Sequence, residues 1–389
     1  MLHRKVLQWL STKRYNWRNY DFSLIAVVLM LSVISTFILS RAANNFSMSK
    51  HLIGLTVGFV IMGIVSIIDY HTLCRFVLVF YLIATAMVIA TKFSPIGTDL
   101  NTNSFRWLKF GSLYFQPSEV CKIVIILILA AFFSRYVENE DKNIRSVKVF
   151  IFACLITLVP TGFILIQSDL SSSMVIIMIL VMMLISSGVG ARILGPVAAT
   201  AVLLIGGFIW YIVTPGKKLF LNEYQVKRIV GFFNQEEEAL DTMFQQNNSV
   251  VSIASGKLYG KYLVNPDPSV RNYNTVSVRD SDFVWTPISE EFGFIGCMII
   301  LVLLSVIIIK CFLSAKKARD YMGMMIAIGI ATMFTIQVFF NIGVATSILP
   351  NTGLPLPFLS NGLSSLLSSM IAVGILINIR IQPARRRDL

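Results

Sequence analysis

The sequence predicts an all-α polytopic membrane protein with about ten transmembrane helices and one long extracellular loop. Composition is the first indication, because 56% of the 389 residues are hydrophobic and only 14% are charged, whereas soluble domains carry about 25% charged residues. The second indication is a series of apolar segments of transmembrane length. The third is an uneven distribution of Lys and Arg between alternate loops. The bilayer is therefore the main solvent of this chain.

Ten apolar segments are long enough to cross the hydrocarbon core, which requires roughly 17–25 residues. Residues 1–21 precede them and are basic and aromatic, without the apolar core of a signal peptide. We expect a basic cytoplasmic N-terminus at 1–21, one transmembrane domain at 22–380 with a long outer loop at 214–287, and a basic cytoplasmic tail at 381–389. The predicted spans lie near 22–40, 52–69, 73–91, 119–135, 148–166, 172–188, 192–213, 288–309, 322–346 and 363–380.

The positive charges of the short loops set the orientation. One side, which includes both termini, holds 19 Lys and Arg residues, and the opposite short loops hold only 5. Both termini are therefore expected in the cytoplasm. The net charge of +13 then reflects membrane topology, so nucleic acid is not an expected partner. The 5 cysteines and 3 histidines form no metal or disulfide pattern, and we predict neither a metal site nor a His-based centre.

Glu119 and Lys122 open the fourth predicted span, at a depth where ionisable residues are usually functional. Their spacing of three places them on one face of a helix. Two interpretations stay open: an ion pair that lines a polar cavity, or a capping carboxylate beside a lysine that extends to the interface. Asp169 lies in the turn before the sixth predicted span, and it is either the N-cap of that span or a functional carboxylate.

The stretch 279–296 gathers four carboxylates, Asp280, Asp282, Glu290 and Glu291, before an apolar run. Glu290 and Glu291 suit the start of a helix, where negative charge is favoured. Asp282 lies too far before the predicted span to cap it. Its apolar neighbours would shield it partly from water, which suits a general base. A solvated loop aspartate is the alternative interpretation.

Basic residues are frequent in the outer loop on the N-terminal side of Asp282. They would bind a diphosphate beside a base, or they would face lipid head groups. These residues are Arg228, Lys257, Lys261, Arg271 and Arg279.

The segment 347–365 contains several Gly and Pro residues and therefore cannot be regular helix throughout. Irregular backbone at membrane depth must be buried in protein or line a cavity. The segment either contributes polar groups such as Ser360 to a cavity or closes the bundle as a re-entrant loop.

Taken in order, these segments resemble the shape, elongation, division and sporulation (SEDS) family, which includes RodA, FtsW and SpoVE. The resemblance covers about residues 20–380, and its motifs are individually weak but share one order on one topology. The motifs are Arg106-Trp107 with FQPSEVCKI, Gln167-Ser168-Asp169-Leu170, Tyr224-Gln225 with Arg228, Asp282-Phe283 with Glu290-Glu291, and LPNTGLPLPFLS.

The resemblance implies an inverting peptidoglycan glycosyltransferase that polymerises lipid II at the outer face of the bacterial cytoplasmic membrane, for elongation, division or sporulation. The catalytic aspartate of the family falls on Asp282. The implied partners are lipid II, an undecaprenyl-diphosphate-linked glycan and a class B penicillin-binding protein. No cofactor is certain, and a divalent cation, Mg²⁺ or Mn²⁺, stays open. The implied substrate-binding or supporting residues are Arg106, Glu119, Lys122, Asp169, Arg228, Arg279 and Ser360.

The chain departs from the family pattern at several positions, which indicates a divergent member. Ser168 and Ser171 replace the Pro and Gly of the family's Q-P-D-L-G turn, and Asp280-Ser281 replaces the His-Thr before the aspartate. Two other functions stay open: a flippase or transporter for a lipid-linked precursor, and a non-catalytic scaffold of a cell-wall complex. Charged groups at the outer face favour the enzyme, since a transporter needs such groups near the midplane.

Overall fold

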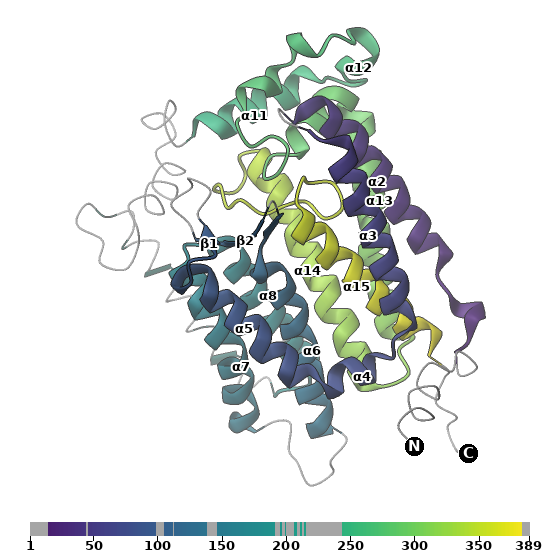
Figure 1. The fold of residues 1–389 in the computed structure, drawn as a ribbon, viewed down its shortest axis with the longest axis vertical. Helices are drawn as coiled ribbons and strands as arrows, with labels where there is room; N and C mark the ends of the chain where they lie inside the picture. Colours follow the sequence, from purple (N-terminus) through teal and green to yellow (C-terminus); the bar gives the residue numbers. More distant parts are fainter. Residues whose placement is uncertain are drawn as a thin grey trace.

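The computed structural model describes residues 15–43, 46–98, 105–111, 113–137, 146–190 and 243–382, with a few isolated positions between 191 and 242. This part of the chain is a helical bundle with a small sheet at one side, about halfway along its length (Figure 1). The longer helices are α2 (Phe22–Ala42), α3 (Met48–Ile67), α5 (Val77–Phe93), α6 (Pro117–Val137), α7 (Val147–Ile166), α8 (Leu170–Ser186), α11 (Phe244–Ser255), α13 (Trp285–Lys316), α14 (Tyr321–Ala345) and α15 (Leu363–Ile381). The short elements are α4 (Tyr70–Arg75), α12 (Lys261–Val264), the 3-10 turns η2 (Trp17–Asn19), η3 (Pro268–Val270) and η4 (Asn272–Thr275), and the strands β1 (Gly97–Thr98), β2 (Trp107–Phe110) and β3 (Leu113–Phe115).

The structure confirms the predicted all-helical, multi-pass fold. Seven of the helices in the described ranges are long and apolar enough to cross a membrane, namely α2, α3, α6, α7, α13, α14 and α15. Helices α5 and α8 are apolar and have 17 residues each. Nine of the ten predicted spans thus correspond to described helices. The remaining predicted span, at 192–213, lies outside the described residues apart from isolated positions, and so does the loop from 215 to 242.

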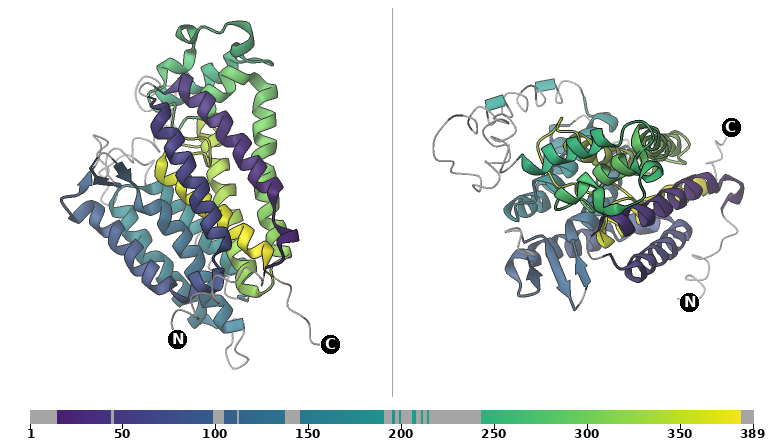
Figure 2. Two further views of the ribbon diagram at one scale, coloured as in Figure 1. Left: turned by 45° about the vertical axis from the view of Figure 1, so that its right-hand side comes forward. Right: turned by 90° about the horizontal axis from the view of Figure 1, so that it is seen from above.

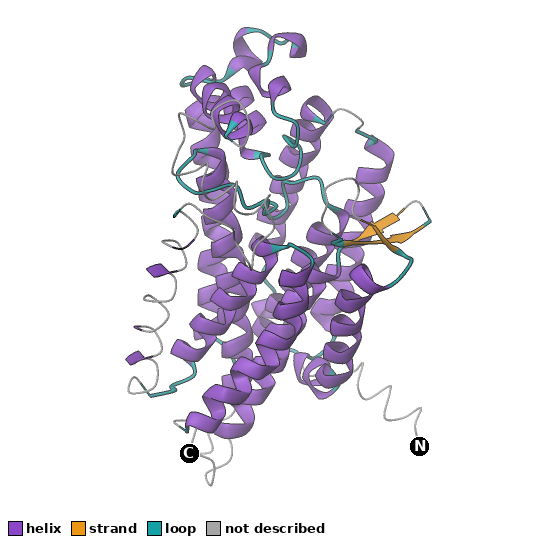
Figure 3. Cartoon of the chain, turned by 90° about the vertical axis from the view of Figure 1, so that its left-hand side faces the viewer, coloured by secondary structure: helices purple, strands orange, loops and turns teal. Residues whose placement is uncertain are grey.

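Two local features differ from the prediction. The third predicted span is interrupted at Phe76, which separates the short helix α4 from α5. The loop before α6 contains an antiparallel sheet in the order β1-β2-β3, with Thr98 opposite Trp107 and Lys109 opposite Tyr114. Figure 3 shows this sheet beside the helix ends.

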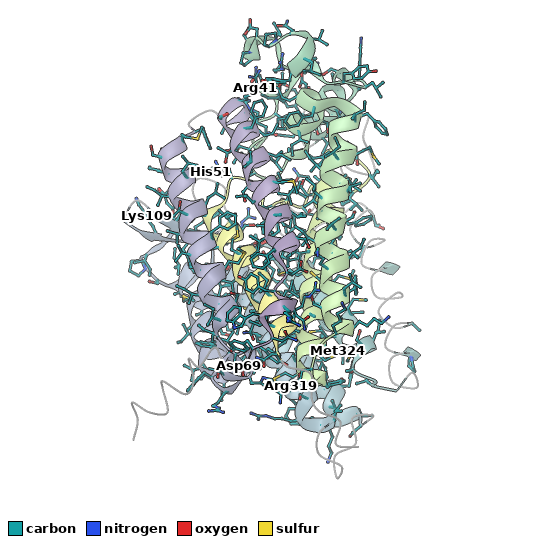
Figure 4. The ribbon with its side chains drawn as sticks, turned by 90° about the vertical axis from the view of Figure 1, so that its right-hand side faces the viewer. Arg41, His51, Asp69, Lys109, Arg319 and Met324 are labelled. Atoms are coloured by element: carbon teal, nitrogen blue, oxygen red, sulfur yellow. The ribbon has the colours of Figure 1, made fainter. Side chains whose placement is uncertain are left out.

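The two ends of the bundle are distinguished by the groups that meet there (Figure 4). At one end, which we call the loop end, Arg41 in the last turn of α2 pairs with Glu291 near the start of α13 at 3.2 Å. Asp69 and Arg319 lie at the other end, which we call the terminal end because Asn16 donates a backbone hydrogen bond to Ile381 there.

Ion pairs join the helices at the terminal end. The carboxylate of Asp21 accepts a hydrogen bond from Lys310 at 2.8 Å and also pairs with Arg380, so the ends of α2, α13 and α15 are joined. The ring of His71 lies between two aspartates. Its Nδ1 is 2.8 Å from Asp69 Oδ1, and its Nε2 is 2.5 Å from Asp320 Oδ2. We call the two groups together the terminal clamp: Asp21, Lys310, Arg380, Asp69, His71 and Asp320.

The imidazole of His71 must carry both of its protons to donate to both carboxylates. Burial disfavours the charged ring, but hydrogen bonds to Asp320 and Asp69 outweigh burial and raise the pKa of His71 to about 9. The ring is therefore an imidazolium at neutral pH, and it holds the segment after α3 against the start of α14.

Residues 244–279 form a cap over the loop end of α2 and α13 (Figure 2). Gly293 lies inside α13 with φ +65°, and a β-carbon there would lie 2.3 Å from the backbone nitrogen of Gly260. Glycine at 293 thus allows both a break in the helix and the close approach of the cap.

Two buried carboxylates of α13 bind the cap. Glu290 accepts hydrogen bonds from Lys261 at 2.6 Å and from the backbone N–H of Tyr273 at 2.8 Å. Glu291 accepts from Arg271 at 3.0 Å. Two of the four carboxylates in the 279–296 stretch therefore have a structural role, because they hold the cap in place.

Candidate functional site

Asp282 lies in the turn that precedes α13, two residues before its N-cap residue Val284, and Val284 makes no side-chain cap bond. The turn packs against the 350–361 loop, which connects α14 to α15. Asn341 of α14 donates through Nδ2 to the carbonyl oxygen of Asp282 at 2.9 Å. The hydroxyl of Ser360 donates to the carbonyl oxygen of Ser281 at 2.6 Å. The backbone that presents Asp282 is therefore fixed on both sides.

The neighbouring aspartate is bound to the same loop. Asn361 donates through Nδ2 to Asp280 Oδ2 at 2.9 Å, and its backbone N–H donates to the carbonyl oxygen of Asp280 at 2.8 Å. These bonds hold the Asp280 side chain against the loop. The sequence carried no sign of these bonds, because the partners are about 80 residues apart.

Gly353 brings the 350–361 loop against the carboxylate of Asp282. Its φ is +75°, and a β-carbon at this position would lie 2.9 Å from Asp282 Oδ2. Only glycine combines this backbone conformation with such a close approach. The Gly and Pro residues of this segment predict irregular backbone, but nothing in the sequence marks Gly353 as a neighbour of Asp282.

Most of residues 354–360 in this loop are buried in protein, which suits irregular backbone at membrane depth. The side chains of Leu354, Leu356, Phe358 and Leu359 are all buried. The loop is also bonded to α2, because Ser35 donates to the carbonyl oxygen of Leu359 at 3.0 Å. The structure thus supports the interpretation of a re-entrant loop that closes the bundle.

Glu119 and Lys122 form a buried ion pair. Lys122 Nζ lies 2.7 Å from Glu119 Oε1, and the two residues are 0% and 1% exposed, respectively. Lys122 is buried against Glu119 and does not extend to the interface, while a polar cavity beside the pair stays a prediction. Ser368 of α15 lies 3.4 Å from the other carboxylate oxygen of Glu119. The pair therefore lies between α6 and α15.

Asp169 is the N-cap of α8 and also binds neighbouring side chains, while a functional role for its carboxylate stays a prediction. Its Oδ1 accepts from the backbone N–H of Ser172 at 3.1 Å and caps α8. Its Oδ2 accepts from the side chains of Gln116 and Ser118 at 3.2 and 3.3 Å. Arg106 approaches Oδ1 to 4.0 Å. The Nε of Arg106 is buried and has no hydrogen-bond acceptor among the described residues.

Three helices begin in this region, at Pro117 in α6, Leu170 in α8 and Leu363 in α15. The backbone N–H of Gln116 donates to Ser364 at 2.9 Å, and Ser171 donates to the carbonyl oxygen of Thr352. These bonds connect the three helix starts to the 350–361 loop that faces Asp282. Helix N-termini carry partial positive charge, so together with Arg106 they favour an anionic group.

Of the other cations predicted for the site, Arg279 is engaged by protein groups. Arg279 is buried, and its guanidinium donates to the carbonyl oxygens of Ala42 and Asn274 and lies 5.7 Å from the ring centre of Tyr273. Arg228 lies outside the described residues. A role of Arg279 and Arg228 in substrate binding stays a prediction. Within the described ranges no three His, Cys, Asp or Glu side chains gather as a metal site.

Comparisons with known proteins identify one family. The family model for FtsW, RodA and SpoVE, described as a cell cycle protein, matches residues 17–384. The chain is 28% identical over 377 residues to the probable peptidoglycan glycosyltransferase FtsW of Bacillus subtilis, which covers 93% of this chain and 91% of that protein. It is 30% identical over 371 residues to stage V sporulation protein E of the same organism. That match covers 92% of this chain and 96% of the relative.

The fold is also that of a chain of known structure. The solved chain comes from a structure titled as the structural coordination of polymerization and crosslinking by a peptidoglycan synthase complex. The match has a TM-score of 0.77 at 23% identity and covers 93% of the present chain and 97% of the other.

Proposed function

This chain belongs to the FtsW/RodA/SpoVE (SEDS) family of peptidoglycan glycosyltransferases, and from that premise we propose that it polymerises lipid II into glycan strands. The observation that carries the proposal is the placement of Asp282. This carboxylate lies in a turn whose backbone is fixed by Asn341 and Ser360, and it faces a glycine. A fixed carboxylate at the loop end suits a general base.

The proposed reaction is a single displacement with inversion. Asp282 accepts the proton of an acceptor sugar 4-hydroxyl while the hydroxyl oxygen forms a bond to the anomeric carbon of the growing strand. The bond between that carbon and the diphosphate breaks, and undecaprenyl diphosphate leaves with the electron pair. A base placed opposite the leaving group gives inversion at the anomeric carbon.

Arg106 is the cation best placed to bind the leaving diphosphate. Its Nε is buried without an acceptor among the described residues, and three helix N-termini lie nearby. In contrast, Lys122 already pairs with Glu119. Charge-assisted bonds to a diphosphate would stabilise the charge that develops as the leaving group departs. If a divalent cation assists, the described side chains do not form its site on their own.

We infer that the protein works in the bacterial cytoplasmic membrane with both termini in the cytoplasm. The charge distribution supports this orientation, which places Asp282 at the outer face. The proposed partner is a class B penicillin-binding protein, supported by the likeness to a chain of a peptidoglycan synthase complex. The relatives include both FtsW and a sporulation protein, so elongation, division and sporulation are all compatible with the family.

The test is polymerisation of fluorescent lipid II by the purified protein with a candidate class B partner. We expect a ladder of glycan strands from the parent protein and none from Asp282→Asn, which keeps the size of the side chain but cannot act as a carboxylate base. Binding of lipid II should be retained by the variant. A variant that still makes the full ladder would overturn the role of Asp282 and favour the scaffold or transport functions.

A further inference from the structure

Asn341 is a buried amide on the last turns of α14. It is 1% exposed, and its Nδ2 donates two hydrogen bonds, to the carbonyl oxygen of Asp282 at 2.9 Å and to that of Leu354 at 2.7 Å. A side-chain NH₂ group has two protons, so both of its donors are used. Its Oδ1 is buried and accepts no hydrogen bond from the described residues.

The two carbonyl groups belong to segments far apart in the sequence. One is in the turn that carries Asp282, and the other is in the 350–361 loop, directly after Gly353. Since Gly353 is the residue that faces the Asp282 carboxylate, Asn341 sets both sides of that contact. A single amide on a rigid helix therefore fixes the spacing between the carboxylate and the loop.

Two other helices bond to the loop alone: Ser35 of α2 donates to Leu359, and Ser171 of α8 donates to Thr352. Ser360 binds the carbonyl oxygen of Ser281, and Asn361 binds Asp280, but both donors lie in the loop itself. They hold the turn and the loop to each other. Asn341 donates to both the turn and the loop, and it lies on the membrane-length helix α14.

We propose that Asn341 is a positioning residue for Asp282. It holds the Asp282 peptide and the Leu354 peptide at a fixed separation, which directs the carboxylate at the acceptor hydroxyl. This inference rests on the proposed glycosyltransferase function. A reacting group displaced by about 1 Å can lose on the order of 100-fold in rate, whereas the lipid-linked substrate binds through other groups.

The test compares Asn341→Leu, which has a similar volume and no donors, with the parent protein in the strand-synthesis assay. We expect kcat to fall by about 100-fold while KM for lipid II changes by less than about threefold. Asn378→Leu is the matched control. Asn378 is also fully buried and donates to the carbonyl oxygen of Ser66 at 2.9 Å, but it lies at the terminal end. It should lower thermal stability and leave kcat per folded molecule unchanged.

The inference is overturned if Asn341→Leu folds and keeps the parent kcat, or if it loses activity only through a higher KM. If Asn341→Leu does not fold, Asn341→Asp, which keeps the size but has no donors when ionised, is measured in the same way and judged by the same kcat and KM. The parent protein and Asp282→Asn run in parallel. A parent that makes no strands with any partner counts against the proposed function, whereas an active parent with an unaffected Asn341 variant counts against the positioning role alone.

Discussion

The α-carbon of Gly353 faces the carboxylate of Asp282 so closely that a β-carbon there would lie 2.9 Å from Oδ2. Gly353→Ala should therefore displace the carboxylate and lower kcat by about 10- to 100-fold. The positive φ adds roughly 1–2 kcal/mol of backbone strain. Gly111→Ala is the control, because Gly111 has φ +60° and no atom within 4 Å of the added carbon. Equal losses of activity in both variants would mean that strain alone, and not contact with Asp282, matters.

The Glu119–Lys122 pair gives a prediction about stability. Glu119→Gln leaves a buried lysine without its carboxylate, and breaking such a pair costs roughly 3–5 kcal/mol. The double variant Glu119→Gln/Lys122→Met removes both charges and should be more stable than either single variant. Thermal unfolding in detergent measures this. Additive losses in the double variant would show that the two charges do not interact.

Two variants of Asp169 distinguish the capping role of its side chain from the role of its charge. Asp169→Asn keeps a good N-cap for α8, whereas Asp169→Ala removes it at a cost of about 1 kcal/mol. We expect the Ala variant to unfold at a lower temperature than the Asn variant. Both variants should weaken strand synthesis, because Arg106 loses the negative charge beside it. Full activity in Asp169→Asn would show that only the cap is needed.

The terminal clamp predicts a pH dependence of stability. The pKa of His71 is about 9 in the folded protein, above its unfolded value of about 6.5. The protonated ring therefore stabilises the fold fully below about pH 6.5, and this contribution disappears as pH rises through 9.

The measurement is the difference in melting temperature between the parent and His71→Gln across this pH range. It should be largest at about pH 6.5 and shrink toward pH 9.5. His51→Gln is the control, because His51 Nε2 has no hydrogen-bond partner among the described residues. A difference that stays constant with pH would contradict the doubly protonated ring.

The helices were predictable because apolar length is a property of each segment alone. The Glu119–Lys122 pair was predictable for a similar reason, since a spacing of three fixes the two side chains on one helix face. The sheet before α6 was missed because strands of 2 to 4 residues are too short to show alternation.

The partners of the loop-end groups could not be predicted from local pattern. Lys261 and Arg271 looked like diphosphate ligands, yet they bind Glu290 and Glu291, which the same stretch of sequence supplied. Arg279 binds a carbonyl group at Ala42, more than 200 residues away. Such contacts depend on which helix ends meet, and only the three-dimensional arrangement determines that.

The terminal clamp also limits how the bundle can open. It joins the ends of α2, α13 and α15, and it ties the segment after α3 to the start of α14, so separating these ends would break charged contacts that are partly shielded from water. The loop end is also held by ion pairs, which join Glu291 to Arg41 and Arg271 and join Glu290 to Lys261. The terminal clamp thus couples α2, α13 and α15 at one end of the bundle and holds α4 against the start of α14. Strand synthesis at the loop end, as proposed above, would need no separation of these terminal ends.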